Sequence, residues 1–346
     1  MSLKPLRIAI IGLGIVGSGF LKLMYEKKEI LVKDYNMEFE IVAVCDKMRG
    51  SIYNPEGLNL KTVLEEGPSS EKLEGQRGLS SFEIIEVPEI DVVVEATPTN
   101  LENGGVGLQH ARRSLSAGKH FISTNKGAPA LAHDELISIA EEKNVYYGYE
   151  GTVLSGTPAI SLAMHGLPCS RFFSIRGILN GTTNYMLEKM GMEGISFDDA
   201  LKEAQELGYA ETDPTGDIDG WDPCAKVVIL ANNVLKTNIT PKDVELTGIR
   251  NITLEDIKKA KSENKRIKLV ASLHYEDGEL KASVKPELLS RGDPLYHVHG
   301  VTNAITYETD TTDTVTVMGP GAGGRSAGYA MLYDLLEMHR HRTAIY

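Results

Sequence analysis

Short apolar runs alternate with longer amphipathic stretches over the first 150 residues. The runs at Leu6 to Ile11 and Asp91 to Ala96 are apolar almost throughout, which predicts buried strands. Similar runs lie at 39–45, 120–123 and 145–149, and helical stretches lie at 19–26, 105–117 and 133–143. Residues 50–80 are rich in Gly, Ser and Pro and predict a loop with a short helix. This order predicts an α/β fold with a Rossmann-type, doubly wound parallel sheet.

The pattern changes after about residue 150. Residues 196–207 predict a helix that Ser196 caps, and Asp222-Pro223 predict the start of another helix that runs to about Leu235. Alternating runs on both sides of Asp277-Gly278 predict a hairpin. The predicted strands of this part lie at 268–275, 279–285, 304–307 and 314–318. We expect a second, α+β domain with a mixed or antiparallel sheet.

Gly12, Gly14 and Gly17 form a G-x-G-x-x-G motif between the first predicted strand and the first predicted helix. Gly12 permits a tight turn, Gly14 lets a pyrophosphate approach the backbone, and Gly17 lets the helix pack on the strand. Ile15 and Val16 belong to the same loop. The motif predicts dinucleotide binding, and the alternative is a glycine-rich turn without a ligand.

Residues 319–324 are also rich in glycine and precede a helix predicted at 327–338. Glycines directly before a helix let backbone amides approach a ligand, so we expect this tail to return to the first domain. The expected organisation is a dinucleotide-binding domain at 1–150, a substrate domain at 151–318, and the returning loop and helix at 319–346. That layout leaves no length for a separate ligand-sensing domain, so feedback control by one is not expected.

Composition narrows the class of protein. The 48 acidic residues outnumber the 36 basic ones, and no basic stripe occurs, which argues against a nucleic acid partner. Cys45, Cys169 and Cys224 are scattered, as is typical of a reducing compartment, and they disfavour a zinc site or disulfides. Neither a signal peptide nor an apolar stretch of about 18 residues is found. We therefore expect a cytoplasmic protein without a membrane partner.

Asp46 ends the second predicted strand, where an acidic residue commonly binds the ribose hydroxyls of NAD. Lys47 and Arg49 follow directly and favour the 2′-phosphate of NADP instead. The spacing from Gly12 exceeds the usual value, so Asp46 as a plain strand-end residue stays open. The sequence does not choose between NAD and NADP.

Ser123 to Lys126 follow another strand of the predicted parallel sheet. Ligands bind beyond the carboxyl ends of such strands. Lys126 is therefore a candidate for contact with a substrate or a nicotinamide, and a solvated loop lysine is the alternative.

The segment from Gly208 to Lys226 concentrates carboxylates, namely Glu211, Asp213, Asp217, Asp219 and Asp222. Lys226 follows Asp222 by one helical turn if the helix starts near Pro223. Carboxylates bind a substrate ammonium, and a lysine beside them can transfer protons if burial offsets the pKa elevation that they cause.

Two alternatives exist for this segment. A calcium loop starting at Asp213 fails on spacing, because its twelfth position is Cys224 rather than Glu. Helix capping by Asp222 is compatible with catalysis. Upstream, Asn180 and Thr182 are candidates to hydrogen-bond a small polar substrate, with helix capping alone as the alternative.

Several motifs together resemble homoserine dehydrogenases. They are Asn-Gly-Thr-Thr-Asn at 180–184, the run 208–226, Asn-Ala-Ile at 303–305 and Gly-Pro-Gly-Ala-Gly-Gly at 319–324. The resemblance covers nearly the whole chain and is most specific in the run 208–226. It implies NAD(P)-dependent interconversion of L-homoserine and L-aspartate 4-semialdehyde, a step of threonine and methionine biosynthesis, by a homodimer.

The resemblance also implies roles for particular residues. Lys126, Asp222 and Lys226 would be catalytic, and Glu211 and Asp217 would bind the substrate. Thr97, Gly323 and Gly324 would contact the cofactor. The carbonyls of Glu150, Val153, Ser155 and Thr157 would hold a sodium ion, whereas an ordinary interdomain turn is the alternative there.

The chain departs from the family in two places. It has Ser123-Thr124-Asn125-Lys126 where the family commonly has Thr-Ala-Asn-Lys, and residues 95–98 differ from the commonest version. Two other functions stay open: another amino-acid dehydrogenase of the same fold, and a non-catalytic dinucleotide-sensing protein.

Overall fold

The computed structural model describes residues 4–343, except the side chains of residues 342 and 343. The chain divides into two compact units. Unit 1 comprises residues up to Gly156 and from Gly323 onwards, and unit 2 comprises Thr157–Ala322. In the part of the chain that is described, no helix is long and apolar enough to cross a membrane.

Unit 1 is built on a seven-stranded sheet of order β4-β3-β2-β1-β5-β6-β7. Five strands are parallel: β1 (Leu6–Ile11), β2 (Phe39–Asp46), β5 (Val92–Glu95), β6 (His120–Ser123) and β7 (Tyr147–Gly148). β3 (Gly50–Tyr53) and β4 (Gln76–Arg77) add an antiparallel edge. The central strands β1 and β5 are almost completely buried, as expected for a sheet covered on both faces. The predicted fold class is therefore confirmed.

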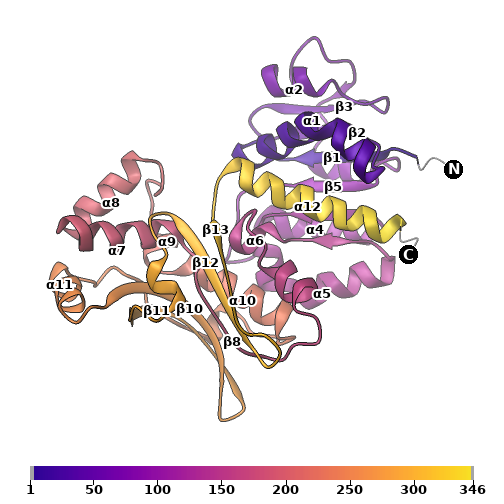
Figure 1. The fold of residues 1–346 in the computed structure, drawn as a ribbon. Coiled ribbons are helices and arrows are strands. Elements are labelled where there is room, and N and C mark those ends of the chain that lie inside the picture. Colours follow the sequence, from indigo (N-terminus) through magenta and orange to yellow (C-terminus); the bar gives the residue numbers. More distant parts are fainter. Residues whose placement is uncertain (1–3, 344–346) are drawn as a thin grey trace. The chain divides into compact units, whose positions relative to one another are not determined.

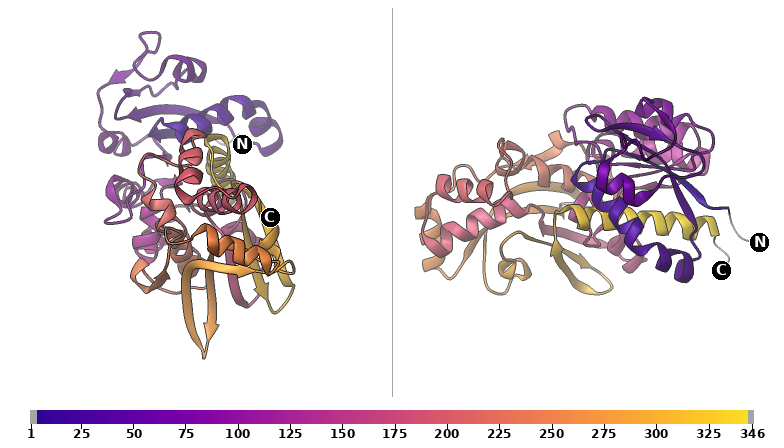
Figure 2. Two further views of the ribbon diagram at one scale, coloured as in Figure 1. Left: turned by 90° about the vertical axis from the view of Figure 1, so that its left-hand side faces the viewer. Right: turned by 90° about the horizontal axis from the view of Figure 1, so that it is seen from above.

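The helices of unit 1 follow the strands in alternation. They are α1 (Ile15–Tyr35), α2 (Leu60–Glu66), α3 (Ser81–Ile85), α4 (Gly105–Ser116), α5 (Gly127–Lys143), α6 (Gly151–Leu154) and α12 (Gly324–Thr343). α12, drawn in yellow, lies alongside the indigo α1 although the two are far apart in sequence (Figure 1, Figure 2). Met331, Leu335 and Met338 of α12 belong to the same apolar core as the strands. The C-terminal helix is thus part of the dinucleotide-type domain.

Unit 2 is a six-stranded sheet of order β13-β12-β8-β10-β11-β9 with helices packed on it. Its strands are β8 (Phe172–Ile178), β9 (Val244–Leu246), β10 (Arg266–Glu276), β11 (Glu279–Leu289), β12 (Thr302–Thr309) and β13 (Asp313–Pro320). Only β9 pairs in parallel. The helices are α7 (Gly181–Glu193), α8 (Phe197–Glu206), α9 (Thr215–Ile218), α10 (Trp221–Val234) and α11 (Leu254–Ser262). Short turns of π- or 3-10 helix lie at Leu162–Gly166, Pro241–Asp243 and Pro294–His297.

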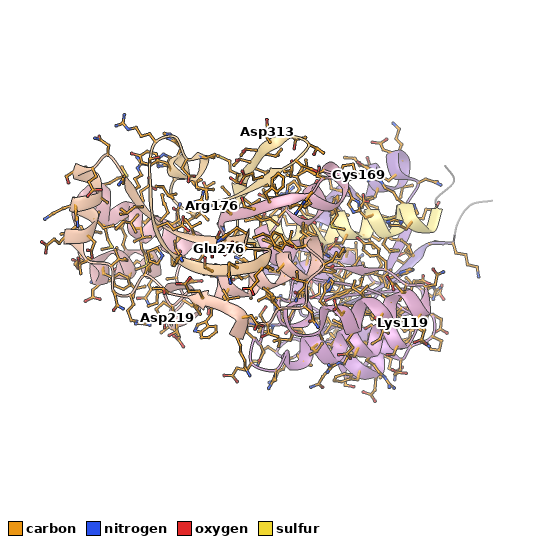
Figure 3. All side chains as sticks on the ribbon, turned by 90° about the horizontal axis from the view of Figure 1, so that it is seen from below. Lys119, Cys169, Arg176, Asp219, Glu276 and Asp313 are labelled. Carbon is orange, nitrogen blue, oxygen red and sulfur yellow. The ribbon has the colours of Figure 1, made fainter. Side chains whose placement is uncertain are left out.

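Local signals of the sequence account for several of these boundaries. Ser196 caps α8 by accepting a hydrogen bond from the Asp199 N–H. Asp277 and Gly278 both have positive φ, 51° and 84°, as a two-residue type I′ hairpin turn requires. The hairpin of β10 and β11 that they close ends next to Glu276 (Figure 3).

Candidate active site

The glycine-rich turn after β1 combines close backbone packing at one glycine with open space at another. Gly12 has a φ of 91°, and a Cβ on it would lie 2.7 Å from the Ala96 carbonyl oxygen. By contrast, nothing lies within 4 Å of the position that a Cβ on Gly14 would take. α1 begins directly after Gly14 without a side-chain cap and without an acidic residue in its first turn. Its N-terminal N–H groups therefore suit a pyrophosphate.

The start of α12 lies against the same turn. A Cβ on Gly324 would lie 2.6 Å from the Ile15 carbonyl oxygen, and the Gly324 carbonyl packs directly on Gly19. Gly323 has a φ of 113° and open space where its Cβ would be. Ile15 is 82% exposed, while Val16 packs against the core beside it. The structure thus brings together the glycines of both predicted loops.

Asp46, the last residue of β2, lies next to the glycine-rich turn. Its carboxylate accepts hydrogen bonds from the N–H groups of Leu13 (2.8 Å), Met48 (2.9 Å) and Arg49 (3.0 Å). Burial works against the charge, but these backbone donors hold the pKa of the carboxyl below its usual value. A fixed anion therefore stands at the end of β2, while Lys47 and Arg49 are exposed in the turn that follows.

Thr97 and Lys126 are held by a buried network at the ends of β5 and β6. Glu95, fully buried, accepts hydrogen bonds from the Thr97 N–H (2.9 Å) and the Ser123 hydroxyl (2.6 Å). Asn125 donates to the Thr97 carbonyl at 3.3 Å and caps the Gly127 N–H at 3.0 Å. Lys126 therefore starts α5 from a fixed backbone position and is only partly exposed.

Sequence reasoning assigned no role to Glu95 or Asn125. The available signal was that polar residues follow two parallel strands, β5 and β6, where ligands bind. The position of such residues can be read from a sequence, but their mutual hydrogen bonds cannot.

In unit 2, a second polar cluster forms where α7 and α10 begin. Lys226 is 5% exposed, and its Nζ donates to Asp222 Oδ2 at 2.7 Å and to the Leu179 carbonyl at 2.5 Å. Asn180 Nδ2 donates to the same Asp222 oxygen at 3.0 Å and to Asp217 Oδ1 at 2.7 Å. One lysine and one amide thus join two carboxylates that lie on different elements.

Asn180 has a structural role as well. Its Oδ1 accepts a hydrogen bond from the Thr183 N–H at 2.9 Å and so caps α7. Asp222, in contrast, does not cap α10, because Gly220 occupies the N-cap position without a side-chain hydrogen bond. The capping interpretation therefore holds for Asn180 and fails for Asp222.

The charge of Asp217 is poorly compensated. Burial and the neighbouring charge of Asp222 raise the pKa of this carboxyl above its usual value, although Asn180 and Lys226 oppose the shift. A cation bound at this position would lower the pKa of Asp217 again, and a substrate ammonium is such a cation.

The remaining carboxylates of the segment 208–226 lie outside this cluster. Glu211 and Asp213 are exposed, and Asp219 (Figure 3) pairs with Arg250 at 2.9 Å. Thr182 is buried, and its hydroxyl donates to the Tyr209 carbonyl at 2.8 Å. In residues 4–343 no group of His, Cys, Asp and Glu side chains is arranged to hold a metal ion.

The loop with the predicted sodium ligands contains one unusual residue. Ser155 has a φ of 52°, and its buried hydroxyl finds no hydrogen-bond partner among the residues described. Glu150, Val153, Ser155 and Thr157 are all buried. Backbone oxygens in such a loop fit the preference of a hard cation for oxygen ligands.

Comparison with known proteins identifies the family. A family model described as the NAD binding domain of homoserine dehydrogenase matches residues 12–150, and one described as homoserine dehydrogenase matches residues 158–336. The homoserine dehydrogenase of Methanocaldococcus jannaschii is 42% identical over 96% of this chain and 98% of its own length. The chain belongs to the homoserine dehydrogenase family.

Further relatives agree with this assignment. An NAD(+)-dependent homoserine dehydrogenase of Pseudomonas canavaninivorans is 38% identical, with 97% of each chain covered. The crystal structure of a putative homoserine dehydrogenase from Archaeoglobus fulgidus has a TM-score of 0.87 at 35% identity and covers 96% of this chain and 99% of that one. A hyperthermophilic archaeal homoserine dehydrogenase mutant in complex with NADPH has a TM-score of 0.82 at 28% identity and covers 96% and 97%.

Membership of this family establishes the reaction. Homoserine dehydrogenases are NAD(P)-dependent oxidoreductases, and the two domain matches cover both units of the chain. The predictions of fold class, activity and nicotinamide cofactor are therefore confirmed. The roles of single residues go beyond these comparisons.

Proposed function

We propose that the cluster of Lys226, Asp222, Asn180 and Asp217, together with Lys126, carries the interconversion of L-homoserine and L-aspartate 4-semialdehyde. The observation behind this proposal is the buried Lys226 ammonium, held at 2.7 Å from Asp222 beside a second carboxylate that lacks full charge compensation. A purely structural lysine would not need a second carboxylate whose charge is only partly compensated.

The reaction requires a proton at the substrate oxygen. The bound nicotinamide supplies or accepts the hydride at the carbon. As the aldehyde carbon gains hydride, its oxygen becomes an alkoxide, and Lys226 donates the proton that neutralises it. In the oxidation of homoserine the same nitrogen takes the proton back. Asp222 orients the ammonium, and Lys126 adds positive potential.

The amino acid end of the substrate needs an acidic partner. We assign binding of its ammonium to Asp217 in the cluster. Glu211, which is exposed outside the cluster, is assigned to the substrate from the resemblance of its segment to the family. Asn180 and Thr182 position the polar groups of the pocket. The raised pKa of Asp217 supports this assignment, because the substrate cation restores the charge balance that burial disturbs.

The dinucleotide binds along the turn of Gly12, Gly14 and Gly17, with the backbone of Ile15 and Val16 at its pyrophosphate. Gly323, Gly324, Thr97 and Lys126 complete that site. Dinucleotide binding then belongs to residues 1–150 with the returning segment 319–346, and the substrate to residues 151–318.

NAD is the preferred cofactor. The Asp46 carboxylate, kept ionised by three N–H donors, accepts the ribose hydroxyls of NAD and repels the 2′-phosphate of NADP. The kcat/KM of homoserine oxidation should favour NAD over NADP by at least ~10-fold, and Asp46→Ser should shift this ratio towards NADP. An NADP preference in the native enzyme would show that Lys47 and Arg49 decide instead.

Besides NAD we assign a sodium ion, bound by the carbonyls of Glu150, Val153, Ser155 and Thr157. The unpartnered Ser155 hydroxyl supports this site.

We further infer that the protein is a homodimer and lies in the cytoplasm. The three cysteines are free, which is consistent with a reducing compartment. Light scattering of the purified protein tests the dimer.

The test of the function is direct. The purified protein should reduce NAD only when homoserine is added. Other hydroxy amino acids, such as serine, should give much lower rates of NAD reduction. Activity on another amino acid instead would favour a different dehydrogenase of this fold. Cofactor binding without turnover of any amino acid would favour a dinucleotide sensor.

A further inference from the structure

A pocket of about 430 Å³ lies in unit 2, apart from the cluster at Lys226. Its walls come from the second half of α7, from α11, from the start of β10 and from the segment after β11. This volume falls within the range of pockets that bind small metabolites. No step of the proposed reaction uses these residues.

The walls carry a concentration of positive charge in an otherwise acidic chain. Five cationic side chains line the pocket: Lys261, Lys265, Arg266, Lys268 and Arg291. Glu188 is the one acidic residue among the lining residues. Its carboxylate already accepts hydrogen bonds from the Gly300 N–H and from His299. One carboxylate beside five cations compensates only a small part of the charge.

Most of these cations have neutral partners. Lys268 is 1% exposed, and its Nζ donates to Asn184 Oδ1 and to the Val298 carbonyl, both at 2.7 Å. Burial lowers the pKa of this ammonium to about 8, although Glu188 opposes the shift. A buried cation with so little counter-charge favours a bound anion.

The other cations differ in how firmly they are held. The Arg266 guanidinium stacks over the ring of Tyr296 at 4.5 Å from the ring centroid, which fixes its plane. Lys261 donates to the Gly191 carbonyl at 3.3 Å, and Lys265 pairs with Glu263. Arg291 is exposed, and its guanidinium has no ion-pair partner among residues 4–343. Arg266 is thus held in place by the ring, whereas Arg291 is exposed at the pocket.

The pocket also has apolar walls. Leu187, Met192, Ile257, Ile267 and the ring of Tyr296 line it beside the cations. Arginine and lysine clusters recognise phosphate groups, which carry nearly two negative charges and several acceptor oxygens. The apolar walls can cover a hydrocarbon or aromatic part attached to the phosphate.

From these features we infer a second ligand site for a small organic phosphate monoester, with its phosphate among Arg266, Lys268 and Arg291 and its apolar part against Ile257 and Tyr296. This site is separate from the homoserine and dinucleotide sites, so the proposal stands independently of the roles given to Lys226 and Asp222.

Phenyl phosphate and inorganic phosphate are suitable probes. Their binding is measured by calorimetry on the full chain at constant ionic strength, with saturating NAD present so that the phosphate-binding turn at Gly14 is occupied. Phenyl phosphate should bind saturably and at least ~10-fold more tightly than inorganic phosphate, because only the ester uses the apolar walls. No saturable binding of phenyl phosphate, or equal affinities for both probes, would overturn the proposal.

Substitutions localise the site. Arg291→Gln and Lys261→Gln alter exposed side chains and should leave folding and homoserine oxidation intact. Together they should weaken phenyl phosphate binding at least ~10-fold, as expected for the loss of charge-assisted hydrogen bonds. Lys281→Gln, an exposed cation on β11 that pairs with Glu279, is the matched control and should leave the affinity unchanged. Equal affinity in the double variant and the control would place the binding elsewhere.

Discussion

Exchanging Asn180 for aspartate separates its two roles. Aspartate caps a helix as well as asparagine does, so Asn180→Asp keeps the acceptor for the Thr183 N–H. It removes the Nδ2 donor that lies 2.7 Å from Asp217 and 3.0 Å from Asp222 and places a third carboxylate there. If capping were the whole role, the substitution would be nearly neutral, and Asn180→Ala would cost about 1 kcal/mol.

The magnitude follows from the distances. Two charges about 3 Å apart repel by roughly 5 kcal/mol at an effective dielectric constant of about 20. Protonation of one carboxyl relieves this repulsion, and at pH 7 that proton uptake costs about 4 kcal/mol for a group of ordinary pKa near 4. The variant takes the less costly route, so the protonation cost of about 4 kcal/mol is the upper limit of the destabilisation. We expect Asn180→Asp to lower the free energy of unfolding by about 2 to 4 kcal/mol at pH 7.

The effect should depend on pH with a defined sign. The carboxyl group's pKa is higher in the folded variant than in the unfolded chain, so the variant loses stability as pH rises from about 4 towards the folded value. At pH 5.5 the proton costs only about 2 kcal/mol, and the defect should shrink accordingly.

Urea unfolding is a suitable assay, because Trp221, the single tryptophan, lies at the start of α10 beside Asp222 and reports on this region. A folded Asn180→Asp protein as stable as the native one at both pH values would refute the bridging role. Asn180→Ala serves as the reference for loss of the cap.

Other predictions concern the cofactor and the substrate. Gly14→Val should weaken nicotinamide dinucleotide binding at least ~10-fold in a folded protein, because its side chain fills the open space at the pyrophosphate position; unchanged affinity in a calorimetric titration would place the cofactor elsewhere. As the solution is acidified, the KM for homoserine should start to rise at a higher pH than an ordinary aspartate would cause, because burial and the charge of Asp222 raise the pKa of Asp217. In Asp217→Asn the KM should be high and should lack this rise; a pH dependence equal to that of the native enzyme would assign the titration to another group.

The sequence predicts the alternating elements of unit 1 well, because buried parallel strands are continuous apolar runs. Element ends were less accurate. The helix expected at 133–143 begins at Gly127, where Lys126 is its N-cap residue, and it carries a kink at Ala132. The pattern does not predict α7, because Gly181 to Asn184 at its start are not apolar. For α11 a signal is present but short: Leu254, Ile257 and Ala260 recur every third residue between charged side chains, after a capping box of Thr253 and Asp256.

For the site, residue types and spacing indicated Lys226 and Asp222 because they lie one helical turn apart. The contact of Asn180 with both carboxylates joins segments about 40 residues apart, and no local pattern indicates such a contact. Likewise, the capping role suggested for Asp222 is wrong, because Gly220 with its positive φ is the N-cap residue of α10, two residues before Asp222.

The role of Lys226 is the central claim, and one substitution tests it most directly. Homoserine-dependent reduction of NAD is measured for the native enzyme, for Lys226→Met and for Lys119→Met. Lys119 (Figure 3) is a matched control, since it is also 5% exposed and also donates to backbone carbonyls, those of Val87 and Ile90, but lies outside the proposed site. Lys226→Met should lower kcat by at least ~100-fold in a folded protein, as expected for loss of a proton-transfer group, whereas Lys119→Met should stay within a few-fold of the native rate. Near-native turnover in folded Lys226→Met would contradict the account.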